Sequence, residues 1–138
     1  MLRKLLKRLS KVELRIPILI PGLGCGVLGM TLPKVSVNLG KYAASLLRDL
    51  EYRGQDSTGA AFLDDKKNIT LLKDVGAPSR LIKTLGIQKQ SGKIFCGQVR
   101  WASAGIVTKE NAQPHVVDCK RQIFGGHNGN IINTTELA

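Results

Sequence analysis

The chain has 138 residues, of which 43% are hydrophobic and 22% are charged, a composition typical of one globular domain. These values exclude a disordered or collagen-like chain, and no apolar run approaches the ~18 residues that a membrane-spanning helix needs. The net charge is +11, of which residues 1–24 carry +5, while the other +6 is spread along the chain without a block. Because only six residues are aromatic, we expect no specific nucleic-acid partner.

Three widely separated cysteines form no C-x-x-C pair: Cys25, Cys96 and Cys119. This number and spacing favour neither a zinc site nor a disulfide framework. We therefore expect no metal, no cofactor and a reducing, cytoplasmic environment.

Residues 1–15 have the pattern of a short basic amphipathic helix, with four leucines on one stripe and cations elsewhere. Pro17 and Pro21 interrupt the apolar stretch that follows. We interpret residues 1–24 as a leader or propeptide-like extension, with a solvated tail as the plain alternative. A secretory signal is less favoured because no A-x-A-like cleavage site follows. Contact of the leader with an anionic membrane is also less favoured, since such an anchor would be weak and sensitive to salt.

From Cys25 onward the pattern predicts an α+β domain. Residues 25–30 predict a short buried strand. Residues 58–63 and 69–74 flank a polar turn and predict a hairpin. Between the first strand and the hairpin, apolar residues recur at helical spacing after Asn38, a candidate N-cap. This helix is expected to close at Gly54. The residues of this apolar stripe are Leu39, Tyr42, Ala43, Leu46, Leu47 and Leu50.

The second half of the chain predicts a helix over residues 78–85, ending at Gly86, and a buried strand over residues 93–101. A long loop over residues 102–115 and a strand over residues 121–127 follow. Residues 133–136 have the pattern of a helix start, directly before the sequence ends at Ala138. We therefore expect a domain that is incomplete at its C-terminus.

Several residues have chemical potential, although each also has a structural explanation. Cys25 could be a small buried hydrophobe, and Asn128-Gly129 an ordinary hairpin turn. Arg100 could stack on Trp101, and the two histidines could be structural. The order of five motifs is more informative than any one of them. These motifs are Cys25-Gly26-Val27-Leu28-Gly29, residues 50–59 (LEYRGQDSTG), residues 97–103 (GQVRWAS), residues 111–115 (NAQPH) and residues 126–130 (GHNGN).

This succession resembles the class II glutamine amidotransferases, over residues 25–138. The resemblance implies an N-terminal-nucleophile αββα sandwich. Residues 50–54 and 100–102 look most like the glutamine:fructose-6-phosphate aminotransferases, whereas Gln55-Asp56 and residues 128–130 lean toward the amidophosphoribosyltransferases. Gln98 stands where the first group usually has His, and Ser103 where it usually has Thr.

The resemblance implies a role for six residues. Cys25 matches the nucleophile, which family members carry at the first position of the mature chain, so the Gly24–Cys25 bond would have to be cut. Asn128 and Gly129 match the oxyanion donors, and Arg100 the arginine that holds the substrate α-carboxylate. Trp101 and Ser103 would shape the same pocket. His115 has no assigned role and is interpreted either as structural or as a residue behind those that touch the substrate.

The resemblance also implies partners. The substrate would be L-glutamine, and the ammonia would pass to a synthase module, fused or separate, that makes an amino sugar phosphate. An acceptor of the phosphoribosyl pyrophosphate type and a non-enzymatic, basic surface-binding protein remain as alternatives. Family members hold the substrate α-amino group with an aspartate after the Asn-Gly motif, but Glu136 is the only acid there. We therefore expect weak or absent glutaminase activity from this chain alone.

Overall fold

The computed structural model describes residues 24–103 and 105–137, and the predicted amphipathic helix in the leader lies outside this part. Its main sheet has four antiparallel strands in the order β1-β4-β2-β3, and a second sheet pairs β5 with β6. The strands are β1 (Gly26–Ser36), β2 (Ser57–Leu63), β3 (Ile69–Val75), β4 (Gly92–Arg100), β5 (His115–Val117) and β6 (Ile123–Gly125). The α-helices are α2 (Leu39–Asp49), α3 (Pro78–Thr84) and α4 (Thr134–Leu137), with 3₁₀ turns at Glu51–Arg53 and Ile87–Lys89.

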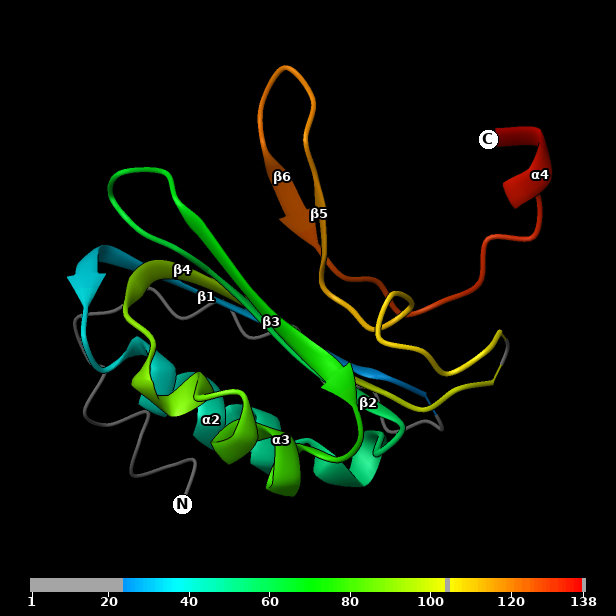
Figure 1. The fold of residues 1–138 in the computed structure, drawn as a ribbon, viewed down its shortest axis with the longest axis horizontal. Helices are drawn as coiled ribbons and strands as arrows, with labels where there is room; N and C mark the ends of the chain where they lie inside the picture. The colour runs from blue at the N-terminus through cyan, green and yellow to red at the C-terminus, as the bar shows by residue number, and fades with distance from the viewer. Residues whose placement is uncertain (1–23, 104, 138) are drawn as a thin grey trace.

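The elements form successive layers (Figure 1). Helices α2 and α3 cover one face of the four-stranded sheet, and the β5–β6 pair lies on its other side. The predicted α+β class is confirmed, and the order helix, sheet, sheet agrees with an αββα sandwich. Within the described residues, no helix is long and apolar enough to cross a bilayer.

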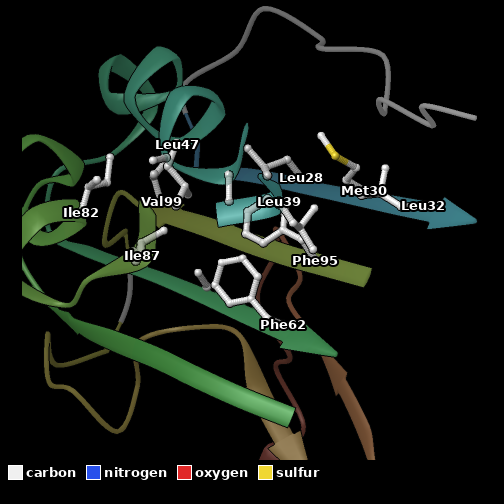
Figure 2. Close-up of a cluster of buried hydrophobic side chains, with 13 residues drawn as sticks. Leu28, Met30, Leu32, Leu39, Leu47, Phe62, Ile82, Ile87, Phe95 and Val99 are labelled. Carbon is white, nitrogen blue, oxygen red and sulfur yellow. The ribbon is translucent and has the colours of Figure 1, made fainter. Parts of the chain in front are cut away.

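The hydrophobic core fills the space between α2 and the four-stranded sheet (Figure 2). Leu39, Ala43 and Leu47, three residues of the predicted apolar stripe, are fully buried there. They pack against alternate residues of the strands, including Phe62 and Phe95, whose ring centroids lie 5.3 Å apart. Because side chains alternate along a strand, the residues between these core positions point to the second sheet.

The hairpin and the strand over residues 93–101 are confirmed, but the other strands differ from the prediction. Strand β1 runs on to Ser36 through Pro33, which is tolerated because β1 is an edge strand with a register shift between Thr31 and Ser36. The strand predicted over residues 121–127 is confined to β6. Its partner β5 was not predicted, since three residues are too short for a visible alternation.

Two predicted helix-end roles are wrong. Asn38 occupies the N-cap position of α2, but its side chain makes no capping hydrogen bond. Gly54 does not close this helix, which ends at Asp49, and its φ of −178° is extended rather than left-handed. Gly54 instead serves close packing against β4, as described below. Gly86 does end its helical segment with a left-handed φ of 68°.

We expect Leu47→Ala to lower the free energy of unfolding by about 2–5 kcal/mol, because it leaves a cavity in a fully buried site. Leu137→Ala is the control: this side chain is 70% exposed, so the change should stay within about 0.5 kcal/mol. Urea unfolding followed by circular dichroism measures both. Equal losses in the two variants would contradict the assigned core.

Candidate active site

The pairing of β1 with β4 places the first described residues beside the end of β4. Gly26 is opposite Val99 in the antiparallel register, so Cys25 lies next to the Arg100-Trp101 segment. The Cys25 thiol donates a hydrogen bond to the Trp101 carbonyl oxygen, with 3.6 Å between sulfur and oxygen. Residues separated by more than seventy positions in sequence are thus brought together by backbone pairing alone.

All six predicted site residues line one cleft of about 610 Å³: Cys25, Arg100, Trp101, Ser103, Asn128 and Gly129. Its remaining described lining consists of Gly24, Gly105, Asn111, Gln113, His127, Asn130 and Ile131. This volume lies in the range of small-molecule binding sites. The described lining holds the guanidinium of Arg100 and no carboxylate, so it favours a ligand with a negatively charged group.

The backbone of the Arg100–Ala102 segment is held by Asp56. The backbone N–H of Asp56 donates to the Arg100 carbonyl oxygen at 3.0 Å, and the Ala102 N–H donates to Asp56 Oδ2 at 2.7 Å. A carboxylate that accepts from a backbone N–H makes a strong, oriented hydrogen bond. Asp56 belongs to one of the five motifs, but its role could not be predicted from the sequence, because its partner is 46 residues away.

Gly54 allows this close approach. A Cβ at position 54 would collide with the Arg100 carbonyl group and would lie 2.7 Å from the Trp101 nitrogen. The glycine is therefore required by the proximity of two backbones and not by its own φ.

The Arg100 side chain extends over the loop that follows β4. Its Nη1 lies 3.4 Å from the carbonyl oxygens of both Ile106 and Asn111. The Asn111 side chain donates to the same Ile106 oxygen at 3.1 Å, which links two residues in the middle of the loop. The guanidinium is thus oriented by backbone carbonyl groups within the cleft wall.

Asn128 contacts Cys25, and Gly129 lines the same cleft. Asn128 Nδ2 donates to the Cys25 carbonyl oxygen at 3.1 Å, and a Cβ on Gly24 would lie 3.4 Å from the same Nδ2. Gly129 has a φ of 155°, a conformation that side-chain-bearing residues rarely adopt, and the space where its Cβ would lie is open. Backbone conformation, rather than crowding within the protein, explains the glycine.

The two other cysteines lie outside the cleft lining. Burial raises the pKa of the Cys96 thiol, against a smaller opposing effect of a hydrogen bond from the Gly126 backbone. Cys119 is exposed, and its thiol lies 2.9 Å from the Arg121 carbonyl oxygen. His115, at the start of β5, is also outside the lining.

Comparison with known proteins places this arrangement in a class. The fold is similar to the solved structure of glutamine phosphoribosylpyrophosphate amidotransferase from B. subtilis, with a TM-score of 0.61, 26% identity, and coverage of 83% of this chain and 23% of that one. No protein-family model matches the sequence. The similarity to this solved amidotransferase confirms the predicted αββα sandwich and the resemblance to the class II glutamine amidotransferases.

The curated relatives with which the chain was compared carry the name of one type of enzyme. The chain is 41% identical over 113 residues to the glutamine–fructose-6-phosphate aminotransferase of Sulfolobus acidocaldarius, covering 82% of this chain and 19% of the relative. It is 36% identical over 113 residues to the enzyme of the same name from Buchnera aphidicola, covering 82% of this chain and 18% of the relative. The chain thus spans about a fifth of the length of these relatives.

We expect Gly54→Ala to lower the free energy of unfolding by about 1–3 kcal/mol, because the added methyl group forces the Arg100-Trp101 backbone away. The exchange rate of the Ala102 amide hydrogen should also rise, as its bond to Asp56 is strained. Gly125→Ala is a matched control, since a Cβ there would have nothing within 4 Å. An unchanged Ala102 exchange rate in Gly54→Ala would contradict the assigned contact.

Proposed function

We propose that this cleft hydrolyses the side-chain amide of L-glutamine, with Cys25 as the nucleophile. The observation that carries the proposal is the convergence of Cys25, Arg100 and Asn128 on one cleft. A thiol can attack an amide carbon, and a guanidinium can hold a carboxylate. A carboxamide can donate a hydrogen bond to an oxyanion.

Arg100 binds the α-carboxylate of glutamine, because its planar fork pairs with both carboxylate oxygens and thereby fixes the substrate's direction. The other end of the substrate then points toward Cys25. Trp101 and Ser103, in the adjoining segment, form the wall between the two ends. The support that Asp56 gives to this backbone keeps the wall at a constant distance from Cys25.

A free α-amino group on Cys25 supplies the base. Its pKa of ~7.7–8.0 suits proton transfer at neutral pH, and only the first residue of a chain has a nucleophilic side chain and this amine together. We therefore propose that residues 1–24 are removed by cleavage of the Gly24–Cys25 bond, which leaves Cys25 as the first residue of the amidotransferase domain.

The reaction then runs in two steps. The amine takes the thiol proton, and the sulfur attacks the amide carbon to form a tetrahedral intermediate. The carbon–nitrogen bond breaks, the amine returns its proton to the leaving nitrogen, and ammonia departs from a γ-glutamyl thioester. A water molecule, deprotonated by the same amine, attacks the thioester; the carbon–sulfur bond breaks, the thiolate takes the proton back from the amine, and glutamate is released.

Both tetrahedral intermediates carry a negatively charged oxygen. The Asn128 side-chain amide and the Gly129 backbone N–H are the proposed donors to it. Loss of one such donor typically slows turnover by ~10²–10³-fold. The contact of Asn128 Nδ2 with the Cys25 carbonyl oxygen supports this assignment, because it brings the amide next to the residue whose sulfur would react.

We further propose that the ammonia passes to a synthase that forms an amino sugar phosphate, as the names of the curated relatives suggest. The similarity to glutamine phosphoribosylpyrophosphate amidotransferase supports the alternative acceptor, phosphoribosyl pyrophosphate. Addition of a sugar-isomerase module or of a phosphoribosyltransferase module separates the two, since only the true partner should stimulate glutamate release.

We expect the glutamine-mimicking electrophile diazo-oxo-norleucine to modify Cys25 selectively, with glutamine slowing the reaction. The thiolate displaces N₂ after the diazo carbon takes up a proton, which leaves a thioether that peptide mass spectrometry can map. Cys25→Ser should abolish this labelling and Cys119→Ser should not. Cys96 should remain unmodified, because burial raises its thiol pKa and keeps it protonated. Labelling of Cys119 alone would exclude the proposed nucleophile.

We expect the chain that begins at Cys25 to react at least tenfold faster with this reagent than the chain that begins at Gly24. The two differ by one residue, but in the longer one the Cys25 nitrogen is an amide and cannot accept a proton. Mass spectrometry of the purified full chain reports whether the bond is cut. Equal rates would rule out the α-amine as the base.

A further inference from the structure

The backbone of His127, directly before the proposed oxyanion donors, is held on both sides by glutamine side chains. Gln98 Nε2 donates to the His127 carbonyl oxygen at 2.8 Å. The His127 N–H donates to Gln113 Oε1 at 2.7 Å. The peptide groups on both sides of the His127 Cα are thus held by hydrogen bonds. The second of these peptide groups joins His127 to Asn128.

Gln98 comes from the rigid part of the fold. It lies in the central strand β4 between the core residues Gly97 and Val99, so its side chain points away from the helices, and it is only 1% exposed. Its Oε1 is buried and has no hydrogen-bond partner among the described residues. A buried amide with one unsatisfied oxygen costs stability, which an apolar residue would avoid. The donor function toward His127 offers a reason for this amide.

Gln113 is held by the loop that carries it. Lys73 Nζ, from β3, donates to the Glu110 carbonyl oxygen at 3.0 Å and to the Ala112 carbonyl oxygen at 2.7 Å. Gly59 in β2 lies so close to the Gln113 carbonyl that a Cβ there would collide with it. Both glutamines therefore transmit the position of the four-stranded sheet to His127.

We infer that Gln98 and Gln113 are positioning residues, which hold the His127 backbone so that Asn128 and Gly129 face the amide of the bound glutamine. This inference rests on the proposed function and assigns the positioning of its oxyanion donors. The two side chains have opposite hydrogen-bonding roles. Gln98 acts only as a donor to His127, and Gln113 only as an acceptor.

The first test uses Gln98→Met and Gln113→Met, which keep the length of each side chain and remove its amide. We expect amide hydrogen exchange at residues 127–129 to rise about tenfold in both, since each loses one hydrogen bond that holds this segment. Gln90→Met is the matched control: Gln90 Nε2 donates to the Gly86 carbonyl oxygen at 3.2 Å, outside the cleft lining. Unchanged exchange at these residues would overturn the inference.

The second test separates positioning from substrate binding. In the same variants, the limiting rate of Cys25 modification by diazo-oxo-norleucine should fall about 10–100-fold, because the donors for its ketone oxygen are displaced. The diazo-oxo-norleucine concentration that gives the half-maximal rate should change less than threefold, since Arg100, which binds the carboxylate of the reagent, is unaltered. A change in this concentration alone, or no change in either value, would overturn the catalytic part of the inference.

Conservative variants provide a rescue. Gln98→His places a ring N–H at a similar reach and should keep the limiting rate within about threefold of the parent, whereas Gln98→Glu offers only acceptors and should not. At the other position, Gln113→Glu keeps an acceptor for the His127 N–H and should retain more activity than Gln113→Met. Equal loss in Gln98→His and Gln98→Glu would point to a purely structural site.

If the parent chain is not modified at Cys25, the proposed function fails, while the exchange experiment still decides whether the two glutamines hold His127.

Discussion

The antiparallel pairing of β1 with β4 is the constraint on which the rest of the site depends. It puts Gly26 opposite Val99, and therefore Cys25 at the edge where β4 leads into Trp101. The pairing needs Gly26 itself, because a Cβ at this position would lie 2.9 Å from the Val99 side chain. Cys25 precedes the first paired residue, so the sheet fixes its position on the C-terminal side.

The four-stranded sheet has two faces with different tasks. On one face, alternate residues such as Phe95 and Val99 pack against α2 and form the hydrophobic core. On the other, Gln98 and Arg100 point toward the second sheet and the cleft. Because the two sets alternate along one strand, a shift of register by one residue would destroy both the core and the site. Stability and chemistry are therefore coupled through the same backbone.

The cleft is also held together by polar groups whose partners are far away in sequence. Asp56 fixes the Arg100–Ala102 backbone, and Gln98 and Gln113 fix His127. Asp56 and Gln98 join the main sheet or its adjoining turn to a loop that has little regular structure of its own, whereas Gln113 joins two such loops. The loops owe their defined positions to these few hydrogen bonds, as expected where a rigid scaffold carries functional loops.

Elements with a strong periodicity and residues in distinctive motifs could be predicted before the fold was known. Leu39, Ala43 and Leu47 predicted the buried face of α2, and the five ordered motifs predicted the fold and six residues that line one cleft. The roles of Gly54 and Asp56 and the contacts of Gln98 and Gln113 became visible only in the folded chain. Local patterns record how a segment folds, whereas these residues act on backbone groups that become neighbours only once the strands have paired.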